Sequence, residues 1–362
     1  MSNERALNGI CPYYTMFPLE FPLEHLNGVA KGSWVFDPFC GRGTTAFAAR
    51  LLGLPSAGTD VNPVAVAIAR AKLVQVKPES IVRLAKKILS TVVPDPTPTG
   101  RFWELAYAPK TLDSILRLRA GLRLTKGPAA DALRGIVLGS LHGPQPKTKD
   151  SYFSNQMQRT FAPKPDYAVR YWEARDMSPH EVDVLGVMRE RAIRYYSEPA
   201  PATPSRIFLA DARTPPIRKQ KFAATVTSPP YYGMDTYVSD QWLRNWFVGG
   251  ETKPNYEKGQ QLSRGGCSEF TKSLAKVWRS VATRSEPGAK LVVRFGALSS
   301  VDSDPEMLMR LSLIASKAPW KIISISQAGG AEVGRRQAEQ MGGTARKSQA
   351  VEELDFVCRL NQ

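Results

Sequence analysis

Short apolar blocks alternate with amphipathic stretches near the N-terminus of the chain. A compact apolar run at 33–40 leads through a glycine turn into a stretch with helical periodicity at 44–52, which we expect Thr44 to cap. A short second strand at 55–60 precedes a helix at 62–72, which we expect Asn62 to cap, with Pro at the first helical position. Strand, glycine turn, helix, strand and helix in this order predict the opening of a doubly wound α/β sheet.

The same alternation returns after residue 204. Five further apolar runs predict strands at 206–211, 222–227, 290–296, 321–326 and 354–360. Two stretches between them, 266–285 and 306–316, have helical periodicity. Together with the two strands near the N-terminus, the pattern predicts one α/β fold with a mostly parallel seven-stranded sheet.

The middle of the chain has a different pattern. It contains stretches with helical periodicity, such as 80–89, 112–124 and 182–196. Proline-rich breaks at 94–98, 144–146 and 163–165 separate them, and no convincing strand occurs. The Pro-Ala-Pro-Ala-Thr-Pro segment at 199–204 has the composition of a stiff connector. We therefore predict an inserted, mainly helical subdomain at 76–204, between an N-terminal part (1–75) and a C-terminal part (205–362) of one α/β domain.

The first predicted strand turns into its helix through Asp37-Pro-Phe-Cys-Gly-Arg-Gly-Thr-Thr45. Glycines at such a turn let the backbone approach a ligand closely, and the following helix N-terminus favours anionic groups. By itself, the Gly-x-Gly pattern fits a tight turn that only packs helix on strand as well as it fits a ligand-binding turn. The segment has no Gly-Lys-Ser/Thr of a P-loop and no third glycine of a dinucleotide-binding turn.

Acidic residues end three of the predicted strands: Asp37, Asp60 and Asp211. Ligands of doubly wound sheets bind at the carboxyl ends of the strands, where an acid in the position of Asp60 binds ribose hydroxyls. In its position, Asp211 can accept a hydrogen bond from an adenine amino group. Each acid alone also fits a solvated turn or a loop cap, but their occurrence at successive strand ends favours a shared ligand site.

The segment Thr227-Ser-Pro-Pro-Tyr-Tyr-Gly233 directly follows another predicted strand. Two prolines cannot continue a central strand, and they hold the backbone in a rigid, extended form. Such a backbone can point a carbonyl at a substrate, while Ser228 adds a hydrogen-bond acceptor and Tyr231 adds a flat face on which a base can stack. A strand-ending turn with a buried Tyr is the simpler alternative.

These segments resemble the motifs of a known family. Residues 37–45 resemble the S-adenosylmethionine-binding motif of amino-directed DNA methyltransferases. The segment Thr227-Ser-Pro-Pro-Tyr231 resembles their catalytic motif, in the form most typical of N4-cytosine enzymes. Tyr14-Thr-Met-Phe-Pro18 and the helix-like stretch 19–26 resemble the segment that precedes the cofactor loop in this family and helps to bind the methionine end.

The resemblance covers residues 13–73 and 205–296, with a weaker match in the last two predicted strands, while the insertion at 76–204 departs from the family. It implies a Rossmann-like class I methyltransferase fold that uses S-adenosyl-L-methionine and no metal. The residues that it assigns to catalysis are Ser228, Pro229, Pro230 and Tyr231. Those that it assigns to cofactor binding are Tyr14, Thr15, Phe17, Asp37, Pro38, Phe39, Gly41, Gly43, Thr44, Thr45, Asp60, Val61, Asn62, Asp211 and Ala212.

The chemistry of this family agrees with these residue types. Cytosine N4 and adenine N6 are poor nucleophiles, because their lone pair is delocalised into the ring. The resemblance implies that Ser228 Oγ and the Pro229 carbonyl accept hydrogen bonds from the amino group, while Tyr231 stacks on a base flipped from the duplex. Positioning then supplies most of the rate without a covalent intermediate. Methylation at cytosine C5 needs a thiolate instead, and no cysteine lies in the loop after 222–227.

Charge indicates the class of partner. The chain carries 49 Lys and Arg against 33 Asp and Glu, a formal charge of +16 that favours a polyanion such as nucleic acid. Residues 76–204 hold 20 of the basic residues against 13 acidic ones. Basic and aromatic residues recur there: Tyr152, Arg159, Tyr167, Tyr171, Trp172, Arg189, Arg191 and Arg194. We predict target recognition by this region, with a plain helical cap as the alternative, and a second DNA contact by the basic loop 328–350.

Composition indicates the cellular compartment of the protein. The four cysteines are scattered without Cys-x-x-Cys spacing, which argues against a zinc site or a disulfide scaffold and fits a reducing cytosol. No apolar run reaches the ~20 residues of a membrane span, and the N-terminus lacks a signal-peptide pattern. We therefore expect a cytoplasmic protein that is associated with the nucleoid through DNA.

The leading hypothesis is a site-specific enzyme that makes N4-methylcytosine in double-stranded DNA by base flipping and direct transfer from S-adenosylmethionine. Three alternatives stay open: adenine N6 methylation by the same site, an RNA amino-group methyltransferase, and a non-catalytic DNA-binding subunit. A cognate restriction endonuclease encoded elsewhere would be the natural partner of such an enzyme in restriction and modification.

Overall fold

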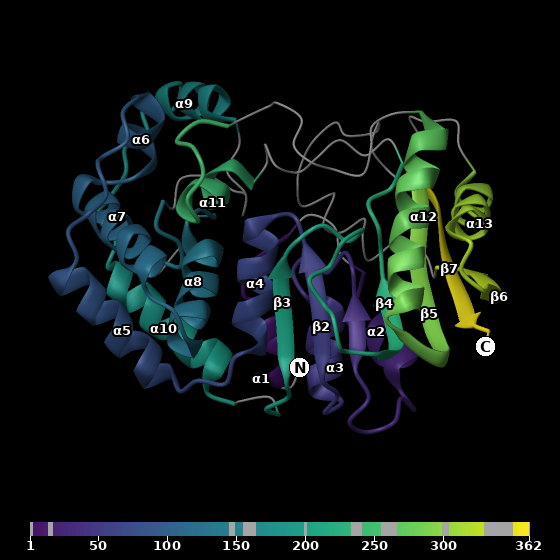
Figure 1. Ribbon diagram of the computed structural model, residues 1–362. Coiled ribbons are helices and arrows are strands. Elements are labelled where there is room, and N and C mark those ends of the chain that lie inside the picture. Colours follow the sequence, from purple (N-terminus) through teal and green to yellow (C-terminus); the bar gives the residue numbers. More distant parts are fainter. Residues whose placement is uncertain are drawn as a thin grey trace. The chain divides into compact units, whose positions relative to one another are not determined.

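The computed structural model describes most of the chain, in two compact units (Figure 1). The described residues are 3–13, 17–144, 149–154, 164–198, 201–232, 241–254, 266–298, 304–328 and 350–361. The first unit comprises Met1–Tyr14, Arg70–Ala200 and Thr236–Glu257. The second comprises Thr15–Ala69, Pro201–Asp235 and Lys258–Gln362.

The second unit is built on a seven-stranded sheet with the strand order β3-β2-β1-β4-β5-β7-β6. Its strands are β1 (Val35–Asp37), β2 (Ser56–Asp60), β3 (Ser205–Leu209), β4 (Phe222–Thr227), β5 (Ser285–Leu298), β6 (Trp320–Gln327) and β7 (Ala350–Leu360). The strands from β3 to β5 pair in parallel, and β7 pairs antiparallel with both β5 and β6. The predicted Rossmann-like α/β fold with a mostly parallel sheet is therefore confirmed.

Five helices accompany this sheet in the described part of the chain: α2 (Glu20–Leu26), α3 (Thr44–Leu51), α4 (Pro63–Leu73), α12 (Cys267–Thr283) and α13 (Pro305–Ser316). The apolar faces of α12 and α13 pack in one core with the central strands, and Trp278 Nε1 donates to Ser312 Oγ at 2.9 Å inside it. As predicted, Asn62 caps α4, because its side chain accepts from the Val64 N–H at 2.9 Å. The expected cap of α3 by Thr44 is wrong: the N-cap is Gly43, which has a left-handed φ of 77°.

The regular elements of the first unit are all helical in the part that the structure describes. They are α1 (Asn3–Ala6), the 3₁₀ turn Leu7–Gly9, α5 (Pro78–Thr91), α6 (Arg101–Ala106), α7 (Pro109–Leu124), α8 (Pro128–Ser140), α9 (Pro165–Glu173), α10 (Val184–Tyr196) and α11 (Trp242–Phe247). The mainly helical character predicted for 76–204 agrees with this. The compact unit also takes in 1–14, 70–75 and 236–257, outside the boundaries that the sequence predicts.

Buried aromatic rings and one buried guanidinium hold the first unit together. Trp103 lies 4.5 Å from Trp246 and 5.8 Å from Trp242, ring centre to ring centre. Arg244 on α11 donates to the Leu138 carbonyl at 3.1 Å and to the Pro12 carbonyl at 2.8 Å. The helix α11 follows β4 in the chain, whereas Pro12 and Leu138 precede it. These bonds therefore join chain segments that are more than a hundred residues apart in sequence.

Within the described ranges, no helix has both the length and the apolarity needed to cross a membrane. The same ranges contain no group of three His, Cys, Asp or Glu side chains placed to hold a metal ion. All four cysteines are free thiols; Cys11, Cys40 and Cys358 are buried, and Cys267 is half-buried.

Candidate active site at the carboxyl edge of the sheet

The strand order of the sheet reverses between β1 and β4. From β1 the chain proceeds to β2 and β3 on one side, and β4 and β5 follow on the other side. Ligands of doubly wound sheets bind outside the carboxyl ends of the strands at such a switch point. The carboxyl ends of β1 and β4 carry the two motifs singled out in the sequence, at 37–45 and 227–233.

Asp37, the last residue of β1, connects these two motifs directly. Its Oδ1 accepts a hydrogen bond from Thr227 Oγ1 at 2.6 Å and another from the Phe39 backbone N–H at 3.1 Å. The side chain is only 1 % exposed. Burial raises the pKa of Asp37 to about 7, although the bond from Thr227 favours the charged form. Asp37 therefore acts as an internal link between β1 and β4, and its contact with a cofactor stays a prediction.

The glycine loop after β1 is fixed to the end of β2. Asp60 Oδ2 accepts from the Gly41 N–H at 2.9 Å, and Oδ1 accepts from the Asn62 N–H at 2.8 Å. Burial raises the pKa of Asp60, while these backbone bonds lower it. In addition, Thr59 Oγ1 donates to the Pro38 carbonyl at 2.8 Å. The loop is thus anchored along its length before any ligand binds.

The two glycines of this loop have different surroundings. Gly41 and Gly43 adopt φ angles of 48° and 77°, both in the left-handed region. A Cβ on Gly43 would lie 2.7 Å from Ala69 Cβ on α4, whereas a Cβ on Gly41 would meet its nearest neighbour, the Phe39 carbonyl, only at 4.0 Å. Gly43 therefore serves the close packing of loop on helix. The open space at Gly41 is the place where a ligand can approach the backbone.

Replacing Gly43 by Ala is expected to lower the free energy of unfolding by about 2–3 kcal/mol, because a left-handed residue and an overpacked contact combine. Replacing Gly41 by Ala adds only the left-handed strain, about 1–2 kcal/mol. Urea denaturation followed by tryptophan fluorescence measures both. The double variant Gly43→Ala with Ala69→Gly should recover the steric part, and equal losses for the two single variants would contradict this interpretation.

Asp211, two residues after β3, has a partner that the sequence analysis missed. The Arg213 guanidinium donates to both of its side-chain oxygens, at 2.9 Å from Nε to Oδ1 and 3.0 Å from Nε to Oδ2. This ion pair lowers the pKa of Asp211. Both side chains are about one-third exposed. Asp211 is therefore ionised and accessible at the carboxyl edge, but any ligand would share it with Arg213.

The other residues predicted to bind the cofactor have mixed positions. Thr45 Oγ1 donates to the Val226 carbonyl at 3.0 Å, which joins α3 to β4. Thr44 and Ala212 are buried, and Val61 is 46 % exposed. Tyr14 and Thr15 lie outside the described residues.

Ser228 stands directly after the last residue of β4, half-buried, and is followed by a buried Pro229 and an exposed Pro230. No strand residue pairs with Ser228 in the ladder between β4 and β5, which ends at Thr227 and Val293. The chain therefore leaves the sheet at the serine, as the two prolines predict.

Tyr231 is held in place by contacts on two sides. Its hydroxyl donates to Glu353 Oε1 on β7 at 2.8 Å. The ring meets Phe295 of β5 edge-on, with the ring centres 5.9 Å apart. Burial raises the pKa of Tyr231 well above its usual value, and the charge of Glu353 raises it further. Tyr231 is therefore a protonated hydroxyl donor at neutral pH, and its stacking on a base stays a prediction.

Glu353 belongs to a charged group that the sequence analysis did not identify. On β5, Arg294 donates to Asp355 of β7 through two parallel bonds of 2.7 Å. The Arg294 guanidinium also lies 4.0 Å from the centre of the Phe21 ring on α2. A charged residue inside each of two apolar strand sequences was the available signal, because such residues are rarely buried unless they are paired.

The N-terminal segment reaches this group through aromatic contacts. Phe17 packs edge-on against Phe21, with ring centres 5.1 Å apart, and Phe21 in turn packs edge-on against His25 at 4.9 Å. Phe17, predicted to help bind the cofactor, is thus joined through one ring to Arg294. The segment 17–26 and the end of β5 therefore form one connected structure.

In the helical unit, the residues predicted to recognise nucleic acid divide into two sets. Trp172 is fully buried and belongs to the core, as the alternative of a plain helical cap supposes. Tyr167 is 49 % exposed and stacks with Tyr171, over whose ring the Arg175 guanidinium lies at 3.9 Å. Residues 155–163 and the loop residues 329–349 lie outside the described residues.

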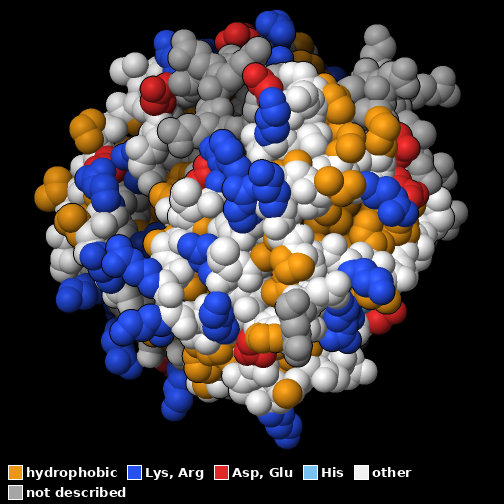
Figure 2. Space-filling model, turned by 45° about the vertical axis from the view of Figure 1, so that its right-hand side comes forward, with side chains coloured by type: hydrophobic (Ala, Val, Ile, Leu, Met, Phe, Trp, Pro, Cys, Tyr) orange, Lys and Arg blue, Asp and Glu red, His pale blue; other side chains and the backbone are white. Residues whose placement is uncertain are grey.

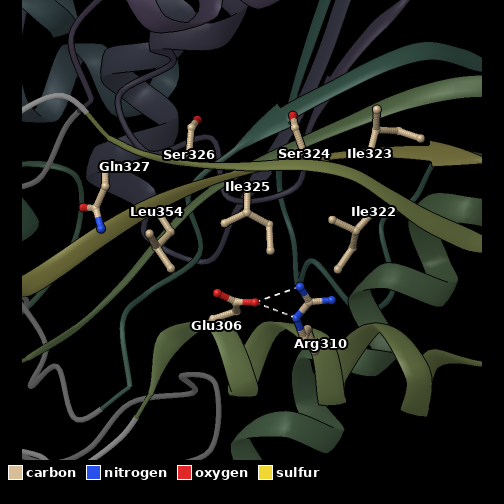
Figure 3. A pocket seen from close by; sticks show the side chains of 9 residues that line it. All are labelled: Glu306, Arg310, Ile322, Ile323, Ser324, Ile325, Ser326, Gln327 and Leu354. Atoms are coloured by element: carbon tan, nitrogen blue, oxygen red, sulfur yellow. Dashed lines mark hydrogen bonds and ion pairs between the residues drawn. The ribbon is translucent and has the colours of Figure 1, made fainter.

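A groove of about 570 Å³ opens beside the edge strand of the sheet (Figure 3). It lies between α13 and β6, where the Glu306 carboxylate pairs with Arg310 at one wall. Its lining consists of Glu306, Arg310, Ile322, Ile323, Ser324, Ile325, Ser326, Gln327 and Leu354. None of these residues belongs to either motif, so the groove is not the site at the carboxyl edge.

Comparison with known proteins supports a methyltransferase. Residues 2–71 match the model of a family described as DNA methylase. The matched range includes the glycine loop, β2 and most of α4. No curated protein is similar enough to this sequence to count as a relative.

Solved structures of similar shape are distant. TrmN from Thermus thermophilus aligns over 99 % of this chain and 53 % of its own, with 10 % identity and a TM-score of 0.40, so this chain spans about half its length. The rRNA methyltransferase aviRa from Streptomyces viridochromogenes aligns over 99 % and 93 %, with 14 % identity and a TM-score of 0.36. A SAM-dependent methyltransferase from Methanosarcina mazei aligns over 96 % and 98 %, with 9 % identity and a TM-score of 0.35.

Proposed function

We propose that this protein is an S-adenosylmethionine-dependent DNA methyltransferase that methylates the exocyclic N4 of cytosine in a specific duplex sequence. The observation that carries the proposal is the 2.6 Å bond between Asp37 and Thr227. It joins the glycine loop, where a cofactor would bind, to the Ser228-Pro-Pro-Tyr231 segment, where an amino group would be held. The DNA methylase match over residues 2–71 supports the same class of reaction.

The residues of the carboxyl edge fit S-adenosylmethionine. The glycine loop offers backbone close to open space at Gly41. Half-buried Asp60 ends β2, and ionised Asp211 lies two residues after the neighbouring β3. When bound there, the cofactor would supply an electrophilic methyl group on a sulfonium. Gly41, Asp60 and Asp211 would hold its polar parts.

The substrate amino group would be held by the segment after β4. Ser228 Oγ and the Pro229 carbonyl accept its N–H hydrogens, which turns the nitrogen lone pair toward the methyl carbon. The Pro-Pro backbone keeps these acceptors fixed, so that little reorganisation is needed when the bond forms. This arrangement serves cytosine N4 and adenine N6 alike; serine before Pro-Pro favours cytosine, in keeping with the family resemblance.

Duplex DNA is the partner that the charge favours. On the face seen in Figure 2, Lys and Arg side chains are widespread, and Asp and Glu side chains are fewer. The formal charge of +16 has the sign required to bind a phosphate backbone. Exposed Tyr167 and the stacked pair of Tyr171 and Arg175 in the helical unit are candidate contacts for target recognition. This assignment places the protein in the cytoplasm, on DNA, with a cognate endonuclease as an expected companion.

Methyl transfer from tritiated cofactor to duplex DNA tests the proposal. The wild type should label DNA, and Ser228→Ala should label it about 100-fold more slowly, the loss typical when one preorganised hydrogen-bonding partner of a reacting group is removed. Ser324→Ala, an exposed serine on β6, is the matched control and should leave the rate unchanged.

Mass spectrometry of the labelled nucleosides then separates the alternatives. N4-methylcytosine would support the proposal, and N6-methyladenine would show that adenine is the target base. Label in RNA alone would show that the substrate is RNA. DNA binding without any label would favour a non-catalytic binding subunit. A wild-type rate in Ser228→Ala would contradict the role of the serine.

A further inference from the structure

The Tyr231 side chain reaches across one strand of the sheet to its hydrogen-bond partner. Tyr231 follows β4, whereas Glu353 lies on β7, and β5 separates these two strands in the sheet. The hydroxyl donates to Glu353 Oε1 at 2.8 Å, and the ring meets Phe295 of β5 edge-on. The residue that pairs with Glu353 on β5 is Gly296, so no side chain of β5 stands opposite the carboxylate in the ladder. The tyrosine is therefore held by β5 at its ring and by β7 at its hydroxyl.

We propose that Glu353 is the positioning residue for Tyr231 and fixes the angle at which the tyrosine ring receives the target base. The inference rests on the proposed function, because it needs a base at the Ser228-Pro-Pro-Tyr231 segment. The two prolines fix the backbone up to residue 230, but they leave the two side-chain torsions of Tyr231 free. A hydrogen bond at the far end of the ring restricts both torsions, so the ring face is in place before the base arrives.

The same bond limits what the tyrosine can do to a substrate. Tyr231 has one hydroxyl hydrogen, and it gives this hydrogen to a carboxylate inside the protein. Burial raises the pKa of Tyr231 well above its usual value, so the hydroxyl keeps the hydrogen at neutral pH. Tyr231 therefore acts on a base through its ring face, by stacking, and Glu353 acts only through the orientation of that ring.

The part of β7 that carries Glu353 is itself firmly held. Asp355 lies two residues further along the strand and therefore on the same face of the sheet as Glu353. It accepts two parallel bonds of 2.7 Å from Arg294 of β5. This ion pair fixes β7 against β5 beside Glu353 and occupies the guanidinium. Glu353 thus has a rigid base from which it can hold the tyrosine hydroxyl.

Three variants of the two residues test the positioning role. Glu353→Leu removes the acceptor and should lower the kcat of DNA methylation about 10-fold, less than the ~100-fold that a 1 Å misplacement at a reacting centre can cost. Tyr231→Phe removes the donor but keeps the ring, so it should lose the same amount. Glu353→Gln keeps an amide oxygen that accepts the bond and should turn over close to the wild-type rate. The double variant Glu353→Leu with Tyr231→Phe should be no slower than either single variant.

A matched control and the split between kcat and KM separate positioning from a general loss of structure. Glu306→Leu removes an exposed carboxylate on α13 and should turn over at the wild-type rate. In all these variants the KM for S-adenosylmethionine should stay unchanged, because the bond acts on the substrate side of the reaction. A raised cofactor KM with an unchanged kcat in Glu353→Leu would assign Glu353 to cofactor binding and overturn the proposal.

NMR of protein labelled with ¹³C at tyrosine Cζ tests the bond without turnover. The resonance that is missing from Tyr231→Phe identifies Tyr231. It should move in Glu353→Leu, where the hydroxyl loses its acceptor, and should move much less in Glu353→Gln. An unmoved resonance in Glu353→Leu would show that the bond does not hold the tyrosine, which would overturn the proposal.

The outcomes distinguish a failure of the positioning role from a failure of the proposed function. A wild-type kcat in Glu353→Leu, with the resonance moved, would overturn the role of Glu353 and leave DNA methylation intact. A Glu353→Gln variant as slow as Glu353→Leu would overturn it too, because the charge and not the bond would then matter. If the wild type methylates no DNA although the resonance moves as expected, the bond exists but the proposed function fails, and the positioning role fails with it.

Discussion

Replacing Arg294 by Met is expected to lower the free energy of unfolding by about 3–5 kcal/mol, the cost usual for removing one partner of a buried ion pair. Arg294 and Asp355 have side chains only 11 % and 10 % exposed, and they are joined by two parallel bonds of 2.7 Å. Without the guanidinium, the Asp355 carboxylate would be left charged in an apolar strand. The contact of the guanidinium with the Phe21 ring would be lost as well.

Urea denaturation of Arg294→Met measures this loss of unfolding free energy. Two further variants test whether the loss comes from the burial of the ion pair. Arg310→Met breaks the exposed pair with Glu306, whose side chains are 49 % and 41 % exposed, and should change stability by no more than about 0.5 kcal/mol. The double variant Arg294→Met with Asp355→Leu removes both charges and should regain much of the loss, since an apolar pair can replace a buried ion pair. Equal effects of Arg294→Met and Arg310→Met would contradict the importance of burial.

The sequence was sufficient to predict the α/β fold, because the sheet's strands are short apolar runs that end in recognisable turns. It was weaker in the helical unit, where α6, α8 and α9 were not predicted. The helix α8 contains Gly135 and Gly139, and glycine in a helix interior lowers the helical propensity of a sequence. The helix α9 begins at Pro165, and this proline was interpreted as part of a break although proline is favoured in the first turn of a helix.

The candidate site shows the same limit. The glycine loop and the Ser228-Pro-Pro-Tyr231 segment are contiguous in sequence, so their local chemistry could be recognised without a structure. The bond from Tyr231 to Glu353 joins residues 122 positions apart, and no local pattern reports it. Asp37 shows the converse: an acid at a strand end predicts a ligand, but the structure has it bonded to Thr227 inside the protein.

The link made by Asp37 predicts an unusual dependence of stability on pH. Its pKa is about 7 in the folded protein, because of burial, against an ordinary value of 3.8. Between these values the folded protein holds a proton that the unfolded chain has released, so this residue makes stability fall as pH rises. Its contribution is complete below about pH 4 and is lost as pH rises through 7, a change of roughly 4 kcal/mol.

Asp37→Asn isolates this contribution, because the amide oxygen can still accept from Thr227 and from the Phe39 N–H but does not titrate. Relative to the wild type, the variant is expected to gain up to roughly 4 kcal/mol of unfolding free energy between pH 4 and pH 8. Urea denaturation at several pH values measures the difference between the two proteins, in which other titrating groups cancel. Asp211→Asn is the control with the opposite sign, because Arg213 lowers the pKa of Asp211 and the wild type therefore loses stability, relative to that variant, as the solution becomes acidic. A difference between Asp37→Asn and the wild type that stays constant with pH would show that Asp37 is already ionised in the folded protein, so that its bond from Thr227 outweighs its burial.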